Sequence, residues 1–158
     1  MKVICWNVQG AKKAQVLKEV KFLKRMQNPD IIFLLETLTN DLNSQCIIQR
    51  MGFQNSDFVL PINHSGGIWV LWNNDLLHAA VLNKEPRAIH ILVHDLILNK
   101  NSIVSGMYGP AQEKDKDAFW DHLLHLHSVF DLPWLIVSDL NELESLNEKR
   151  GGRPVSLR

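Results

Sequence analysis

The sequence has few residues that would cross-link it or hold it in a membrane. Its two cysteines, Cys5 and Cys46, are too few for a disulfide framework. We expect both to be reduced, buried thiols, because each lies in an apolar pattern. The first residues, MKVICWNVQG, do not have the apolar core of a signal peptide, and no apolar run approaches the length of a membrane span. These absences favour a soluble, intracellular protein with no membrane partner, and they leave a nuclear location open.

An excess of positive charge is absent as well. Lys plus Arg and Asp plus Glu number 17 each, so the formal net charge is zero. A basic surface, the usual mark of strong non-specific nucleic-acid binding, is therefore not indicated. The balance does not exclude an enzyme that holds nucleic acid through a metal ion. With 46% hydrophobic and 22% charged residues, the chain has the composition of a globular protein, and we expect one domain over residues 1–158.

Hydrophobic periodicity predicts helices and strands in an order typical of a layered α/β protein with a mixed sheet. Strands are expected at residues 2–8, 30–37, 53–60, 67–72, 77–83, 88–98, 102–108 and 134–142, and helices at residues 12–27, 40–51 and 115–130. Asparagine-rich triplets at 73–75 and 99–101 predict hairpin turns. In the second helix, the residues expected to face inward are Leu42, Cys46, Ile47 and Met51, and Gly52 is expected just past its end.

The last apolar run, WLIVSDLNE at residues 134–142, ends in two polar side chains. It predicts a buried strand, and Asp139 and Asn141 would share one face because side chains two apart on a strand do so. A packed core would have to supply hydrogen-bond partners for both groups. A site that handles water, a metal ion or a phosphate would use them.

Three more polar side chains end predicted strands: Asn7, Glu36 and Tyr108. Ligands in open α/β sheets collect outside the carboxyl ends of strands, so we expect these side chains to converge with the Asp139 pair. Glu36 is a suitable ligand for a hard cation, with an oxygen of Asn7 beside it.

Each of these residues also has a simpler interpretation. A single Asn or Asp at a strand end is more often a turn former. Glu36 could cap a helix or lie at an exposed edge, and Tyr108, ahead of Gly109 and Pro110, could cover a turn. The occurrence of all of them at strand ends favours a site.

The motifs at these positions resemble those of a known family. WNVQG with Asn7, FLLET with Glu36, GMYGP with Tyr108, and SDLNE with Asp139 are similar, in order, to motifs of the DNase I-like endonuclease/exonuclease/phosphatase superfamily. GGIWV at residues 66–70, the Phe-Trp pair at 119–120, Pro-Trp at 133–134 and EKRGG at 148–152 resemble most the endonuclease domain of plant LINE-type non-LTR retrotransposons.

The resemblance implies a four-layer α/β sandwich and hydrolysis of phosphodiester bonds in nucleic acid, with DNA as the ancestral substrate. Glu36 would be the principal ligand of Mg²⁺, or of Mn²⁺ in its place, and Asn7 would assist at the metal and the phosphate. Tyr108 would contact the phosphate, and Asp139 and Asn141 would position and activate the water. The Ser and Leu at positions 138 and 140 replace the family's usual Gly and Phe, which changes packing rather than chemistry.

The same resemblance implies later motifs, with a further acidic residue and an Asp-His pair, that have no counterpart here. We therefore expect an incomplete sandwich that lacks its C-terminal part. His122, His125 and His127 lie on the last helix, where a helix surface is a better interpretation than zinc, because no cysteine or carboxylate stands near them at ligand spacing. His90 and His94 lie four apart in a strand, and we expect them to be hydrogen-bonded strand residues, although one of them could approach the substrate.

Three hypotheses follow. The first is a nuclease-type metal site with weak or no activity, because the missing general base is worth two to four orders of magnitude in rate. The second is a non-catalytic remnant or binding module that pairs with a partner chain through its unfinished sheet edge. The third, less favoured by the motifs, is a phosphatase acting on small phosphoesters.

Overall fold

The computed structural model describes residues 1–62, 65–141 and 151. In chain order its elements are β1 (Val3–Asn7), α1 (Ala14–Gln27), β2 (Ile31–Leu35), α2 (Asp41–Met51), β3 (Asn55–Ile62), β4 (Ser65–Trp72), β5 (Leu77–Glu85), β6 (Ala88–Asp95), β7 (Lys100–Tyr108), the single 3₁₀ turn η1 (Glu113–Asp115), α3 (Lys116–Val129) and β8 (Trp134–Asp139). All the helices and strands expected from the sequence are present, with ends that differ by a few residues. Within the described part of the chain, no helix is long and apolar enough to cross a membrane.

The strands form two mixed sheets of four strands each. The first has the order β1-β2-β4-β3 and the second β5-β6-β7-β8. Each contains one parallel pair, β1 with β2 and β7 with β8, while the other neighbours are antiparallel. The parallel pairs place two strand carboxyl ends side by side in each sheet, which is the arrangement that gathers the strand-end polar residues.

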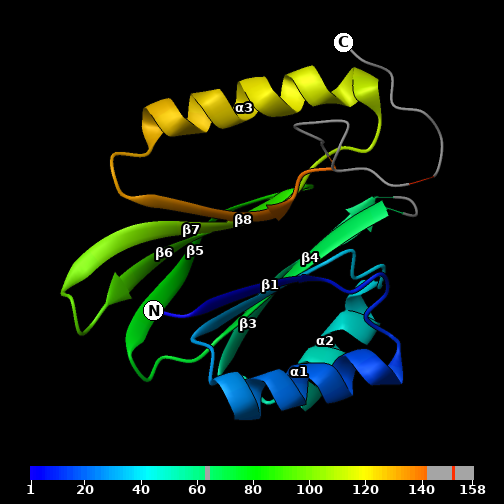
Figure 1. Cartoon of the computed structure of the whole chain (residues 1–158), viewed down its shortest axis with the longest axis vertical. Coiled ribbons are helices and arrows are strands. Elements are labelled where there is room, and N and C mark those ends of the chain that lie inside the picture. The colour runs from blue at the N-terminus through cyan, green and yellow to red at the C-terminus, as the bar shows by residue number, and fades with distance from the viewer. Residues whose placement is uncertain (63–64, 142–150, 152–158) are drawn as a thin grey trace.

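Four layers follow one another in Figure 1, with α3 at the top, then the second sheet, the first sheet, and α1 with α2 at the bottom. A core cluster between the sheets includes Phe33, Val70, Ile91 and Val104. A second cluster joins the outer face of the first sheet to α1 and α2. Because both faces of β2 are covered, its residues are buried without alternation, as the continuous run IIFLL predicted. The chain thus has the predicted α/β sandwich with mixed sheets flanked by helices.

The two sheets approach closely at one glycine. Gly106 in β7 faces Phe33 in β2, and a Cβ atom at Gly106 would lie 2.7 Å from Cγ and 2.5 Å from Cε1 of the ring. Ordinary carbon–carbon contacts are about 3.5–4.0 Å. The missing side chain therefore makes room for the phenyl ring, which is fully buried.

One of the two expected hairpin turns is not a hairpin. Residues 73–75 connect β4 of the first sheet to β5 of the second, so they lead from one layer to the next. Gln54 stabilises this connection by three hydrogen bonds, with Asn73 Oδ1, the Asn74 amide and Asp75 Oδ1. The prediction was wrong because asparagine-rich turns have the same composition whether the next strand pairs with the last one or joins another sheet.

The second hairpin is present, but its turn lies earlier than expected. The turn spans residues 96–99, and Lys100 and Asn101 already belong to β7. Asp95 Oδ1 accepts from the amides of Ile97 and Leu98, both at 2.9 Å. These backbone hydrogen bonds are the main reason that the pKa of Asp95 is lowered.

The inward face of α2 differs from the prediction. Leu42 is 76% exposed and Cys46 is exposed, so the expectation that both are buried is wrong. The buried face runs instead through Ser44, Ile48 and Met51, at the same helical spacing. The hydroxyl of Ser44 donates to its own helix at 2.8 Å, which removes the cost of burying it.

Strand β8 is an edge strand rather than a buried one. Within the described residues it pairs with β7 alone, and it is last in the strand order of its sheet. Leu135 and Ile136 are 41% and 38% exposed, which corrects the prediction that WLIVSDLNE forms a buried strand. Apolar residues on both faces do not distinguish a central strand from an edge strand, because that depends on which strands pair.

Candidate functional site

The predicted site residues lie at strand ends in the structure. Asn7 ends β1 and Glu36 directly follows β2 at the neighbouring position. In the second sheet Tyr108 ends β7 and Asp139 ends β8, and these two residues are paired in the register of the strands. The parallel pairing of each couple places their side chains at the same edge of the sandwich.

Hydrogen bonds across the two sheets bring these four side chains together. Asn7 Nδ2 donates to Asp139 Oδ2 at 2.8 Å, which joins β1 to β8. The Tyr108 hydroxyl donates to Glu36 Oε1, which joins β7 to the end of β2. Both bonds are partly buried, so solvent competes with them less than at the surface. The convergence expected from the sequence is therefore present in the geometry.

Asn141 reaches the same place by a different route from the expected one. Its backbone is left-handed, with φ at 53°, and the strand ends two residues earlier at Asp139. The argument from strand alternation therefore fails for Asn141. Its amide N–H instead donates to Asp139 Oδ1 at 3.1 Å, and its Nδ2 donates to the carbonyl of Gly109 at 2.8 Å. This turn closes the end of β8 onto the end of β7, so Asn141 still lies beside Asp139.

Glu36 is held in a tight turn against two glycines. Its φ is 53°, a left-handed conformation that is uncommon outside glycine and asparagine. Residues with such uncommon backbone conformations are often found at functional sites. The Thr37 amide donates to the Gly67 carbonyl at 3.2 Å, and that of Leu38 to the Gly66 carbonyl at 3.4 Å. A Cβ at Gly67 would lie 2.5 Å from Thr37 Oγ1. The Gly-Gly pair thus positions the Glu36 turn, a role that the sequence motif alone did not reveal.

The electrostatics of this edge affect two neutral acids. The pKa of Tyr108 is raised, first by burial and then by its hydrogen bond to Glu36. The side chain of Asn141 acts in the opposite direction and lowers this pKa. Burial, with the nearby charge of Asp139, raises the pKa of the Cys5 thiol to about 11. Both groups are therefore neutral near pH 7, and Tyr108 is a hydrogen-bond donor there.

The donor set of this edge suits a hard cation. Within the described residues, Glu36 uses Oε1 to accept from Tyr108, and no hydrogen bond engages Oε2. The amide oxygen of Asn7 accepts from the Gln9 amide at 3.1 Å and has a second lone pair. One carboxylate oxygen and one amide oxygen are a typical protein contribution to Mg²⁺, which keeps several waters.

The strand histidines differ from each other. His94 Nδ1 lies 2.8 Å from Asn101 Oδ1, as expected for a hydrogen-bonded strand residue. His90 Nδ1 lies 2.7 Å from Ser105 Oγ, but its buried Nε2 has no hydrogen-bond partner in the described structure. The expectation is therefore confirmed for Nδ1 of His90 but not for its Nε2. Burial, with His122 nearby, lowers the pKa of His90 to about 4.

The helix histidines also differ. His125 and His127 are exposed, as expected for a helix surface. His122 is not a simple surface residue, because its Nε2 is buried and lies 2.6 Å from Glu85 Oε2. The carboxylate comes from β5, far along the chain, so helical spacing could not reveal it. No described histidine hydrogen-bonds to the five predicted site residues.

A model of the endonuclease/exonuclease/phosphatase family matches residues 4–157. The chain belongs to this family. Its enzymes typically use divalent metal ions. The matched range includes all five residues of the candidate site, so the whole site lies within the part of the chain that is similar to the family.

Three solved structures illustrate the fold of the family. They are AP endonuclease LMAP from Leishmania major (17% identity, TM-score 0.71, covering 96% of this chain and 58% of that one), the human nocturnin catalytic domain with bound sulfate (16%, 0.60, 90% and 64%), and mannosyl-6-phosphatase Bt3783 from Bacteroides thetaiotaomicron (10%, 0.62, 89% and 65%). The chain spans less than two thirds of the length of each. A search of curated proteins found no match. At these identities, the similarity to the three structures shows the fold of this chain alone.

Proposed function

We propose that this family member carries a metal-dependent site for hydrolysis of phosphodiester bonds in nucleic acid. The observation that supports this function best is the pair of hydrogen bonds across the two sheets, from Asn7 to Asp139 and from Tyr108 to Glu36. They hold two carboxylates, an amide and a phenol at one sheet edge. That set can bind a hard cation and orient a water, which a packed core does not require.

Each side chain has a role that follows from its contacts. Asp139 is fixed by bonds to both of its oxygens and is the group that accepts the proton of the attacking water. Tyr108, kept neutral by its raised pKa, donates a hydrogen bond to a phosphate oxygen when it leaves Glu36. Glu36 and Asn7 would hold Mg²⁺, with Mn²⁺ as a substitute. The bound cation would offset negative charge on the phosphate.

Basic side chains near this edge favour nucleic acid as the substrate. A pocket of about 350 Å³ lies between α1 and α2, and its lining begins at Ala11, four residues after Asn7. Its basic lining residues are Lys12, Lys13, Lys18, Lys21 and Arg50. Zero net charge therefore does not mean an even distribution, and we propose that some of these cations contact backbone phosphates of the substrate.

A second pocket adjoins the Tyr108 end of the site. It has a volume of about 450 Å³ and is lined in part by Gly66, Arg87 and Lys114, with Asp115 as an acidic neighbour. Tyr108 donates its backbone N–H to the Arg87 carbonyl at 3.0 Å, so the pocket adjoins the predicted phosphate contact. Each pocket has more basic than acidic lining residues, which suits a substrate with several phosphates.

The finer identity of the substrate comes from the sequence motifs. GGIWV and the strand-end motifs resemble the endonuclease domain of plant LINE-type non-LTR retrotransposons, and we propose double-stranded DNA as the substrate on that ground. We expect weak activity from this chain, because no described histidine contacts the site to serve as a general acid or base.

A plasmid-nicking assay with the 158-residue chain tests the proposal. Slow nicking is expected in Mg²⁺ and none in the presence of a chelator. Glu36→Gln and Asp139→Asn are expected to lower the rate by at least about 100-fold each, the typical effect of losing one such catalytic group. Asp121→Asn is the matched control, since it makes the same neutralising change at an exposed position on α3.

The outcomes separate clearly. Nicking that both site variants retain would mean that the activity comes from elsewhere, and absence of nicking at every metal concentration would refute the proposal for this chain. Lys12→Gln with Lys13→Gln is expected to weaken DNA binding and to flatten its dependence on salt. The fraction of nicked plasmid at graded salt concentrations measures this effect.

Two other functions have one supporting observation each. The fold likeness to a mannosyl-6-phosphatase makes a small phosphoester the alternative substrate, and preferential hydrolysis of a phosphomonoester over plasmid would favour it. The exposed apolar residues of edge strand β8 make a non-catalytic module that pairs with a partner chain the second alternative. Association measured by light scattering, and lost in Leu135→Lys, would favour that function.

A further inference from the structure

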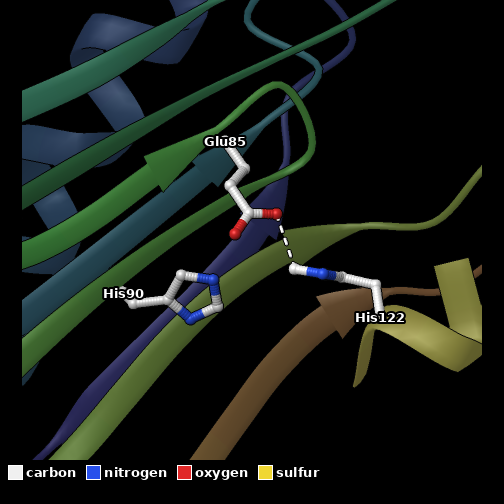
Figure 2. Close-up of side chains that lie close together, drawn as sticks. All are labelled: Glu85, His90 and His122. Atoms are coloured by element: carbon white, nitrogen blue, oxygen red, sulfur yellow. Dashed lines mark ion pairs between the residues drawn. The ribbon is translucent and has the colours of Figure 1, made fainter. Parts of the chain in front are cut away.

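A second group of metal-binding side chains lies on the other face of the second sheet, beneath α3. Glu85 at the end of β5, His90 in β6 and His122 in α3 point toward one another (Figure 2). One possible ligand atom from each residue lies within 4.8 Å of the other two. Tyr108 faces the core between the sheets, whereas His90 packs beneath α3, so this group is separate from the Glu36 edge.

Two of the three donor atoms have no hydrogen-bond partner within the described structure. His90 is fully buried and its Nε2 is not hydrogen-bonded. His122 Nε2 is also buried, and although it lies 2.6 Å from Glu85 Oε2, the contact is an ion-pair distance without hydrogen-bond geometry. Leaving a buried group such as His90 Nε2 without a partner is unfavourable. A buried imidazole nitrogen without a partner, close to a second imidazole and a carboxylate, is an arrangement that a bound metal ion would satisfy.

The groups behind these donors suit metal binding as well. Ser105 Oγ accepts from Trp134 Nε1 and has a second lone pair for the N–H of His90 Nδ1, 2.7 Å away. That arrangement leaves the lone pair of His90 Nε2 free. Asn83 Nδ2 donates to Glu85 Oε1 at 3.0 Å, which leaves Oε2 for an ion. Ligating histidines and carboxylates generally have such partners behind them.

A β-bulge turns Glu85 toward this face. Val81 pairs with Ile91, but Asn83 pairs with His90, so one residue of β5 is skipped. Val81 packs in the core between the sheets. Without the bulge, side-chain alternation would point Glu85 into the same core, whereas with it Glu85 joins His90 beneath α3. The irregularity is therefore what brings the carboxylate to the histidines.

We propose that Glu85, His90 and His122 form a binding site for Zn²⁺ or a similar borderline transition-metal ion, which fastens α3 to the second sheet. Two imidazoles and a carboxylate are a known zinc ligand set and leave one position for water. Tetrahedral bonds of about 2.0–2.1 Å require donors about 3.3 Å apart, so His122 and Glu85 separate slightly while the three close around the ion. Glu85 and His122 are partly exposed, with side chains 27% and 34% accessible, which gives the ion a path from solvent.

Zinc titration of the metal-free chain tests this site. One Zn²⁺ per chain is expected by calorimetry, together with a rise in Tm, because an ion that binds only the folded state stabilises it. Co²⁺ in its place is expected to give the visible absorption of a tetrahedral site. Glu85→Gln and His122→Gln are each expected to weaken binding by more than about 100-fold, because loss of groups behind the ligands alone costs about 10- to 100-fold.

The controls make each outcome decisive. His125→Gln and Asp121→Asn change exposed residues of the same helix and are expected to leave zinc affinity unchanged. Glu36→Gln is expected to keep the site as well, which separates it from the proposed Mg²⁺ site. No saturable binding, or binding that Glu85→Gln and His122→Gln leave intact, would overturn the proposal. Glu85→Gln and His122→Gln are used for the test in place of a His90 variant, because His90 is buried and its replacement could unfold the chain.

Discussion

The contact between Gly106 and Phe33 sets the spacing of the two sheets, and Gly106→Ala tests it. The added methyl group would meet Cδ1 of the ring most closely and Cε1 and Cγ at 2.5 and 2.7 Å, which is about 1 Å or more inside ordinary carbon contact. Neither partner can move away easily, because Phe33 is fully buried and Gly106 lies within paired strand β7. Overpacking of this kind costs about 1–3 kcal/mol. We expect the upper half of that range.

Thermal and urea unfolding measure the effect. For a chain of this size, a loss of about 2–3 kcal/mol lowers Tm by roughly 4–12 °C. Phe33→Leu replaces the rigid ring by a smaller side chain that lacks Cε1 and can rotate its δ carbons away from the methyl group. We therefore expect the double variant with Gly106→Ala to be more stable than the sum of the single effects predicts, by at least about 1 kcal/mol. Phe58→Leu, on the helix-facing side of the first sheet, is the control and should be additive with Gly106→Ala.

Two results would refute this reasoning. If Gly106→Ala changed the free energy of unfolding by less than about 0.5 kcal/mol, the methyl group would fit between the sheets without overlapping the ring of Phe33. If Phe33→Leu and Gly106→Ala were strictly additive, the ring would not be the group that the methyl meets.

Three further predictions concern a helix cap and two titrating groups. Asn40→Ala is expected to cost about 1 kcal/mol in urea unfolding, because the Asn40 side chain caps α2 at 3.1 Å; no change would mean that the cap is not formed. Native protein at pH 8 is expected to react with a thiol reagent rapidly at exposed Cys46 and slowly at Cys5, whose pKa is raised to about 11, and equal rates would contradict that burial. Tyr108 is the single tyrosine, so tyrosinate absorbance reports it alone: its midpoint is expected above the ordinary value near 10 and lower in Glu36→Gln, while stability falls as pH rises through that range. An unshifted midpoint would contradict the Tyr108–Glu36 contact.

The strand-end rule predicted the convergence of Asn7, Glu36, Tyr108 and Asp139 because it depends only on where each apolar run stops. Strand pairing does the rest, since each run belongs to a parallel pair. Asn141 was placed correctly for the wrong reason. Its left-handed turn depends on hydrogen bonds to Asp139 and Gly109, which the periodicity of the strand does not describe.

Features that depend on partners distant in sequence were not predicted. The exposure of Cys46 depends on which stripe of α2 meets the first sheet, and the spacing of the apolar residues does not decide that. The Glu85, His90 and His122 group depends on a bulge and on the packing of α3, so neither helical nor strand spacing reveals it. Sequence patterns report the period of an element, while its neighbours decide which face is covered.

The division of the two sheets along the chain has a consequence for synthesis on the ribosome. The strands of the first sheet all precede residue 73, and those of the second all follow residue 76. The first sheet can therefore pair completely while the second is still being translated, with the face that carries Phe33 open to solvent until its cover arrives. Asn7 and Glu36 lie at strand ends of the first sheet, which is translated before Tyr108 and Asp139 of the second sheet. The hydrogen bonds between them form only when the halves dock, so they mark the completion of folding.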